Sequence, residues 1–354
     1  MEPLITFPYW GNYSIAFKTL FEEIGLKVIP PEKTNFKTII EGSKLAPEMF
    51  CFPMKVTIGS YLEAIKNGAN TIFIVQNVGG SCRQRYYGRI QEKILKEVGY
   101  KINFLDFKTR PLDIYLKLKK ISNASFFRIL RAAIFFFKKL WLIEKIEKLA
   151  QYYRPKEIEK GLTDKILNEG YLKIEKVKKK NFSKTKEEIL KKFKEIKIDK
   201  NKNNLKIGLI GEIYTVTDPT VNFDIERKLG QEGIEVHREM SLNYHIKKGV
   251  FFWKSWLMQR RIKPYLASSV GGHGRDAIDE MLKYIKEGFD GIIHLLPFGC
   301  MPEITVRPIL EKLHKESGIP FLSLSLDEQV AEAGINTRLE AFIDVVKNYH
   351  KNKF

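Results

Sequence analysis

Runs of apolar residues alternate with amphipathic stretches along the first hundred residues of the chain. LITF (4–7) and TIFIVQNV (71–78) are continuous apolar runs, which are typical of buried strands. NYSIAFKTLFEEIG (12–25) and VTIGSYLEAIKNGA (56–69) have apolar residues at helical spacing. Two further strands and a third helix follow the same alternation, in LKVIPP (26–31), YKINFLDF (100–107) and RYYGRIQEKILKEVG (85–99). Strands that alternate with helices predict a parallel α/β sheet.

The same alternation begins again at residue 205. The predicted strands are LKIGLIGE (205–212), IEVHRE (234–239), DGIIHLLPF (290–298) and IPFLSLSLD (319–327). The predicted helices are DPTVNFDIERKLGQEG (218–233), GRDAIDEMLKYIKEGF (274–289), EITVRPILEKLHKESG (303–318) and TRLEAFIDVVKNYHKNKF (337–354). Asp218 is a good N-cap and Pro219 suits the first helical position, so we expect a helix to open there. The pattern predicts two parallel-sheet units of the Rossmann-like, doubly wound type.

The segment between these units differs from both. Residues 121–154 form one long helical pattern with cations among aromatic residues, and residues 173–204 are rich in lysine and mostly helical. We therefore expect an N-terminal α/β domain over 1–107, a basic helical insertion over 108–204 that ends in the linker DKNKNN, and a C-terminal α/β domain over 205–354.

The positive charge is concentrated in that insertion. The chain has a net charge of +19, and residues 101–204 contain 29 Lys and Arg against 13 Asp and Glu. The surplus fits a docking surface for an acidic partner, a nucleic-acid contact or a solvated surface, and we favour the last because no recognised nucleic-acid motif is present. FFRILRAAIFFFKKLWLI (126–143) also offers an apolar face for a second subunit or a homodimer.

The sequence shows neither a pattern typical of a secretory signal peptide nor one typical of a membrane-spanning helix. The N-terminal MEPLITFPYWGNY lacks a basic region of the secretory type, and no window approaches 18 uncharged apolar residues. We expect a cytoplasmic protein without a membrane span. In that compartment the three cysteines, Cys51, Cys82 and Cys300, are expected to be thiols.

All three cysteines lie in segments bounded by glycine or proline. Cys82 and Cys300 each follow an apolar strand pattern, through GGSC and PFGC. Cys51 shares with Cys300 a proline two positions later. Because ligands of open parallel sheets bind where the strands end, these thiols are candidates for one shared site. The simpler interpretation, that each cysteine is a small buried apolar residue, stays open.

Three thiolates without a carboxylate–histidine cluster favour a soft metal centre. A cubane iron–sulfur cluster normally takes four cysteines, so three would leave one iron for another ligand. The spacing by itself does not distinguish an iron–sulfur cluster from zinc.

Six motifs, in order, resemble the 2-hydroxyacyl-CoA dehydratase superfamily, and most closely its small acyl-CoA dehydratase activase-related members. They are EMFCFPMK, GGSCRQRYYG, GEIYTVTDPTVNFDIERKLG, SVGGHGRDAI, PFGCMPE and DEQVAEAGINTRLEAF. The resemblance covers roughly residues 1–100 and 205–345 and leaves the basic middle unmatched.

That resemblance implies one [4Fe-4S] cluster per chain, held by Cys51, Cys82 and Cys300. It also implies a partner, an ATP-hydrolysing activase of the actin-like fold that delivers low-potential electrons, and an acyl-CoA substrate. Near such an anionic cluster, Arg83 would balance charge, while Gly271 and Gly272 in the turn before a helix would bring backbone donors close. Gly299, directly before Cys300, completes the candidate cofactor-binding set.

Two hypotheses follow for the function. In the first, the protein is an iron–sulfur redox carrier or a reductive, lyase-type dehydratase component that works with the activase. In the second, it is a non-enzymatic scaffold or assembly subunit with a structural metal centre, and its basic helices bind a partner or nucleic acid.

Overall fold

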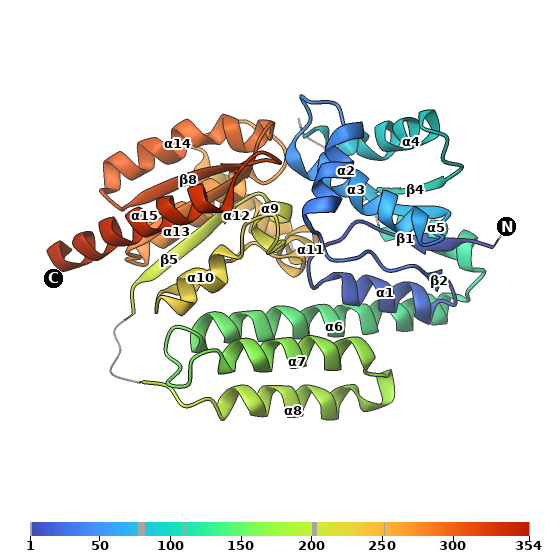
Figure 1. The fold of residues 1–354 in the computed structure, drawn as a ribbon, viewed down its shortest axis with the longest axis horizontal. Coiled ribbons are helices and arrows are strands. Elements are labelled where there is room, and N and C mark those ends of the chain that lie inside the picture. The colour runs from blue at the N-terminus through green and yellow to red at the C-terminus, as the bar shows by residue number, and fades with distance from the viewer. Residues whose placement is uncertain (1, 77–81, 109–110, 200–203, 251, 354) are drawn as a thin grey trace. The chain divides into compact units, whose positions relative to one another are not determined.

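The structure is a computed structural model that describes residues 2–76, 82–108, 111–199, 204–250 and 252–353. Its residues form two compact units, one made of Met1–Leu140 with Gly299–Met301 and the other of Trp141–Phe298 with Pro302–Phe354. Each unit contains a four-stranded sheet whose strand pairs are all parallel (Figure 1). The predicted α/β fold class with two parallel-sheet units is confirmed.

The sheet of the first unit has the strand order β2-β1-β3-β4. Its strands are β1 (Leu4–Thr6), β2 (Lys27–Val28), β3 (Thr71–Gln76) and β4 (Asn103–Lys108). The helices around it are α1 (Ser14–Glu23), α2 (Phe36–Leu45), α3 (Phe52–Lys66), the short 3-10 helix η1 (Arg83–Tyr86) and α4 (Tyr87–Glu97). The order places β3 in the interior of the sheet, next to the point where the chain reverses its direction of winding.

Both faces of β3 are buried, as its continuous apolar run predicts. Phe73 belongs to an aromatic cluster, with its ring centroid 4.9 Å from Phe21 and 4.6 Å from Phe107. Ile72 and Ile74 belong to a separate, largely aliphatic core cluster. Because successive strand residues point to opposite faces, Ile72, Phe73 and Ile74 supply side chains to both cores.

Helices α2 and α3 approach each other closely through two glycines. A Cβ atom at Gly42 would lie 1.9 Å from the carbonyl oxygen of Lys55, and one at Gly59 would lie 1.8 Å from that of Thr38. Glycine is therefore required at both positions, and the contact fixes the helix that begins directly after Cys51.

The second unit repeats the topology of the first, with the strand order β6-β5-β7-β8. Its strands are β5 (Lys206–Gly211), β6 (Glu235–His237), β7 (Gly291–Pro297) and β8 (Phe321–Leu326). Its helices after β5 are α9 (Ile213–Thr217), α10 (Ile225–Gln231), α11 (Leu242–Val250), α12 (Phe252–Ile262), α13 (Gly274–Lys286), α14 (Met301–Ser317) and α15 (Glu332–Lys353). Every residue of β7 is buried, which matches the uninterrupted run GIIHLLP.

The described residues between β4 and β5 are mostly helical. They are α5 (Pro111–Ser122), α6 (Phe126–Tyr153), α7 (Leu162–Lys176), the 3-10 turn η2 (Lys179–Asn181) and α8 (Phe182–Lys194). A Cβ atom at Gly170 of α7 would lie 3.2 Å from Ile146 of α6 and 3.4 Å from Ile189 of α8, so α7 packs between the other two (Figure 1). Most of the predicted linker, residues 200–203, lies outside the described residues.

The predicted helix over 218–233 is wrong in its first half. The Asp218 carboxylate accepts backbone N–H groups of Thr220 and Val221 at 3.0 and 3.4 Å and caps a turn instead of a helix. Phe223 and Asp224 then take left-handed φ values of 56°, and α10 begins only at Ile225. The sequence patterns also missed four helices, α2, α9, α11 and α12.

No helix among the described residues is long and apolar enough to cross a membrane, in line with the absence of an 18-residue apolar window.

Candidate metal centre

Each cysteine directly precedes a helical element. Cys51 is the N-cap of α3, with extended backbone (φ −68°, ψ 152°) and Pro53 in the first turn. Cys82 precedes η1, which continues into α4, and Cys300 precedes α14. All three cysteines lie outside helices and strands. The glycines of the predicted GGSC loop lie outside the described residues, so that loop itself stays undescribed.

Arg83 connects the three cysteine-bearing segments within the first unit. It follows Cys82 in the chain, and its guanidinium donates one hydrogen bond to the carbonyl oxygen of Met49 and one to that of Gly299, both at 2.7 Å. Met49 lies two residues before Cys51, and Gly299 immediately precedes Cys300. A single side chain thus fixes the backbone beside all three thiols.

The Arg83 guanidinium is positioned further by an aromatic ring. Its central carbon lies 5.1 Å from the centroid of the Phe50 ring, within the range of a cation–π contact. Phe50 in turn contacts Tyr87, with ring centroids 6.0 Å apart. The sequence suggested that Arg83 balances the charge of a cluster. In the structure the guanidinium also donates hydrogen bonds to two backbone carbonyl groups.

Gly299 lies against the backbone of the Cys51 segment. Its φ is +74°, a conformation that side chains rarely allow, and a Cβ atom there would lie 3.2 Å from the carbonyl oxygen of Phe50 and 3.3 Å from the Cα of Cys51. Both the conformation and the close approach call for glycine. The structure therefore brings Cys51, Gly299 and Cys300 into one neighbourhood of the first unit.

Tyr87, the first residue of α4, is the residue that the sequence analysis missed. Its hydroxyl forms a hydrogen bond with the sulfur of Cys51. Burial raises the pKa of Tyr87 far above 10, and the nearby thiols of Cys51, Cys82 and Cys300 raise it further. The phenol therefore keeps its proton and is available as a donor. The hydrogen bond ties the start of α4 to the cysteine that precedes α3.

The described side chains do not form a recognisable site for a single metal ion. Among the described residues, no three His, Cys, Asp or Glu side chains lie close enough together to hold one metal ion. The ligands of a cubane cluster sit on different iron atoms and lie further apart than ligands that share one ion. Thiolates are soft ligands, and both iron–sulfur clusters and zinc ions are bound by them in proteins.

The two predicted glycines of the SVGGHG turn lie in the second unit. Gly271 and Gly272 have φ values of 76° and 47° and lead into α13. The N–H of Gly271 donates to the hydroxyl of Ser269 at 3.2 Å, so this donor is used within the turn.

Two histidines that could have served as a fourth ligand have other partners in the second unit. His294 is fully buried, with Nε2 2.9 Å from a carboxylate oxygen of Glu303 and Nδ1 3.2 Å from the Ser323 hydroxyl. The Nδ1 of His273 accepts the N–H of Ile213 at 3.4 Å. Both side chains thus have structural roles in the state described.

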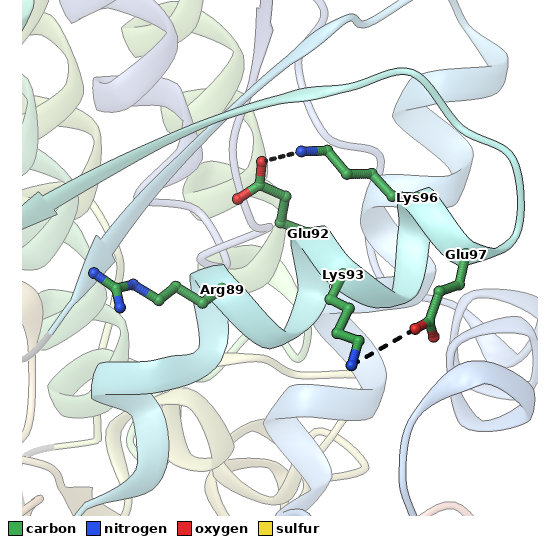
Figure 2. Close-up of a pocket in the computed structure, with 5 residues that line it drawn as sticks. All are labelled: Arg89, Glu92, Lys93, Lys96 and Glu97. Atoms are coloured by element: carbon green, nitrogen blue, oxygen red, sulfur yellow. Dashed lines mark hydrogen bonds and ion pairs between the residues drawn. The ribbon is translucent and has the colours of Figure 1, made fainter.

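A surface pocket of about 420 Å³ on α4 is not a comparable candidate for a functional site. It is lined by Arg89, Glu92, Lys93, Lys96 and Glu97 (Figure 2). Lys96 pairs with Glu92 at 2.6 Å and Lys93 with Glu97 at 3.8 Å, both within one helix. These spacings are those of ordinary ion pairs on a solvated helix face.

Comparison with known families agrees with this architecture. Residues 176–346 match the model of the 2-hydroxyglutaryl-CoA dehydratase D-component, which assigns the protein to the 2-hydroxyacyl-CoA dehydratase-related superfamily. Residues 6–242, more than half of the chain, match the CoA enzyme activase uncharacterised domain, and the chain belongs to that family. No curated protein gave a match. The resemblance found in the sequence motifs is confirmed at the level of the superfamily. The expectation that the basic middle is unmatched is wrong, because the match over residues 6–242 includes it.

Proposed function

We propose that the protein is an iron–sulfur component related to the 2-hydroxyacyl-CoA dehydratases, with Cys51, Cys82 and Cys300 as the ligands of one [4Fe-4S] cluster. The observation that carries the proposal is the pair of 2.7 Å hydrogen bonds from Arg83, which joins the segments of all three cysteines. Thiols that are held near one another on glycine- and proline-bounded backbone are suited to a soft metal centre.

The surroundings of the thiols favour an anionic group. Cys51 caps the N-terminus of the 15-residue helix α3, where the helix dipole stabilises negative charge. Tyr87 offers a protonated hydroxyl to the Cys51 sulfur, and Arg83 supplies a fixed positive charge. When bound, such a cluster would supply one-electron reduction and, at the iron without a cysteine ligand, a Lewis-acid position. The proposal also includes Gly299, whose backbone lies against that of Cys51.

We further propose that an ATP-hydrolysing activase of the actin-like fold is the electron donor and that an acyl-CoA thioester is the substrate class. The matched family names refer to a CoA enzyme activase and to a 2-hydroxyglutaryl-CoA dehydratase. The protein would act either as an electron carrier or as the reductive dehydratase component itself. Reduction by an activase in the presence of ATP, with and without turnover of a 2-hydroxyacyl-CoA, distinguishes these two roles.

Anaerobic reconstitution tests the proposed cluster. The protein should bind about four iron and four sulfide per chain and turn brown. Cys51→Ser, Cys82→Ser and Cys300→Ser should each lose most of this iron. A colourless, iron-free product after reconstitution of the intact chain would contradict the proposal.

The Arg83 hydrogen bonds provide a second, more specific test. Arg83→Ala should keep the fold but retain less iron, because the segments of the three cysteines are no longer joined. Arg85→Ala is the matched control, since the Arg85 guanidinium lies over the neighbouring Tyr86 ring at 4.6 Å. Equal iron content in the two variants would show that the Arg83 contacts do not organise the site.

A further inference from the structure

The long helix α6 has an exposed apolar face that its own fold leaves uncovered. Five large apolar residues, which we call the α6 stripe, are each between 42% and 66% exposed. They are Phe127, Leu130, Ile134, Phe137 and Trp141. Their spacing of three and four residues places them along one line of the helix.

A different face of α6 holds the helix to the rest of the protein. Phe136 is buried, with its ring centroid 5.2 Å from that of Phe17 in α1. Leu140, Ile143 and Ile146 are fully buried on the same helix. A surface helix needs one apolar face for its fold, so the α6 stripe is a second apolar face without a role in the described core. Exposed apolar surface of this kind marks interaction sites.

Cations follow the α6 stripe at regular intervals. Arg131, Lys138 and Lys145 are all exposed and lie seven residues apart, so they border the stripe on one side. The first acidic residue of α6 is Glu144, near the end of the stripe. In an antiparallel pair, a second copy of this helix would bring the same cations to the same border, which disfavours such a homodimer. A partner with carboxylates at the matching positions is favoured.

The shape of the α6 stripe favours a helix over a membrane surface. Its residues occupy only the positions of a coiled-coil seam, which is narrower than the apolar face of a helix that lies in a bilayer interface. We propose that the α6 stripe binds an acidic amphipathic helix of a partner protein. That helix would carry apolar residues at three- and four-residue spacing and Asp or Glu beside them.

Two synthetic probes test this proposal with the full-length chain. Both are labelled helical peptides of about 28 residues, the length of α6, with leucine at the seam positions. One has glutamate and the other lysine at the flanking positions, and fluorescence anisotropy measures their affinities. The acidic probe should bind at least about tenfold more tightly, a difference of about 1.4 kcal/mol. Equal or reversed affinities would overturn the proposal.

Variants locate the binding to the α6 stripe. Ile134→Ser and Phe137→Ser should each weaken the binding of the acidic probe by about tenfold or more. Leu172→Ser is the matched control. Leu172 is an apolar residue on α7 that is 56% exposed and lies outside the stripe. Arg131→Glu combined with Lys138→Glu should reverse the preference between the probes. Circular dichroism establishes that each variant keeps its helix content.

Two further measurements test whether a second copy of the chain or a membrane surface binds the α6 stripe instead. Sedimentation velocity detects a homodimer, and flotation with vesicles of phosphatidylserine and phosphatidylcholine detects membrane binding. A dimer, or vesicle binding, that Phe137→Ser abolishes would overturn the proposal in favour of that occupant. A monomer that binds only the acidic probe would support it.

Discussion

At the scale of single residues, the candidate centre depends on side chains that hold the cysteine segments as much as on the cysteines. Arg83 fixes two backbone carbonyls, and Gly299 allows the backbone before Cys300 to lie against Cys51. Ligand sulfurs in protein clusters are generally tuned by hydrogen bonds from neighbouring groups. Tyr87 makes such a bond to Cys51.

Removal of this hydroxyl should lower the reduction potential of the reconstituted centre. A hydrogen bond to a ligand sulfur stabilises the more negative, reduced state, so Tyr87→Phe should shift the potential downward by roughly 50 mV. Tyr86→Phe is the matched control, because Tyr86 is exposed and its hydroxyl accepts a hydrogen bond from Arg85. Redox titration followed by electron paramagnetic resonance measures both. Identical potentials for the two variants would remove Tyr87 from the centre.

Sequence patterns predicted the three cysteines and, beside them, Arg83 and Gly299 as candidate site residues, but not Tyr87. The three thiols were recognisable because glycine or proline bounds every cysteine of the chain. Tyr87 gave no signal, because a tyrosine within a helical pattern is ordinary core. Its role depends on the fold bringing the start of α4 beside the N-cap of α3, and residues 51 and 87 are far apart in sequence.

At the scale of elements, strands and long amphipathic helices were predictable, whereas short and irregular helices were not. The central strands β3 and β7 were recognised because each lies in a continuous apolar run, as expected for strands that are buried on both faces. The helix at 218 failed because the Asp218 carboxylate can cap a turn as well as a helix, and local sequence does not decide between them. Helices α11 and α12 were missed because no regular apolar spacing was recognised across residues 242–262.

The contact between α2 and α3 gives a prediction for the element that carries Cys51. In Gly59→Ala the new methyl group would meet the carbonyl of Thr38, so the helices must separate and stability should fall by about 3 kcal/mol. Gly334→Ala in α15 is the matched control, since a Cβ atom there meets nothing within 4 Å. It should be neutral or stabilise the protein by up to about 1 kcal/mol.

Chemical denaturation measures both glycine variants, and iron analysis after reconstitution adds a functional measurement. Because α3 begins directly after Cys51, the Gly59→Ala variant should also retain less iron than Gly334→Ala. Equal stability of the two variants would show that α2 and α3 can separate at little cost, and the close contact would then not fix the position of Cys51.

At the scale of the whole molecule, two units with the same strand order carry different kinds of polar group. The cysteine segments belong to the first unit, whereas the second unit buries several ionisable side chains that the proposed centre does not use. Such groups make stability depend on pH, because their pKa values differ between the folded and the unfolded chain. His273 and Glu280 should act in opposite directions.

His273 should make the second unit less stable in acid. Burial, together with the neighbouring His245, lowers the pKa of His273 from 6.5 to about 4. Below pH 6.5 the unfolded chain takes up this proton while the folded chain does not, so stability is lost as pH falls from 6.5 toward 4. The loss should reach about 3 kcal/mol. His273→Gln should therefore flatten the acid side of the stability profile, which urea denaturation between pH 4 and 7 measures. An unchanged slope over this range would contradict the assignment to His273.

Glu280 should make the second unit less stable as pH rises. Both of its carboxyl oxygens are buried without a hydrogen-bond partner among the described residues, and its side chain is 3% exposed. Burial, with Asp276 and Glu239 next, raises the pKa of Glu280 well above 4.5. Above pH 4.5 the unfolded chain releases this proton while the folded chain keeps it, so stability falls with increasing pH until the folded-state pKa is reached.

Replacement of Glu280 by an apolar side chain of similar length should therefore stabilise the protein, which is unusual for a buried position. Glu280→Met removes a buried polar group without partners and should raise stability by about 1–3 kcal/mol at pH 8 and by less at pH 5. Glu287→Met, at an exposed position on the end of α13, is the control and should change little. Urea denaturation at the two pH values measures the difference. A destabilised Glu280→Met variant, or a gain that is larger at pH 5, would show that the carboxyl is ionised and bound in the folded protein.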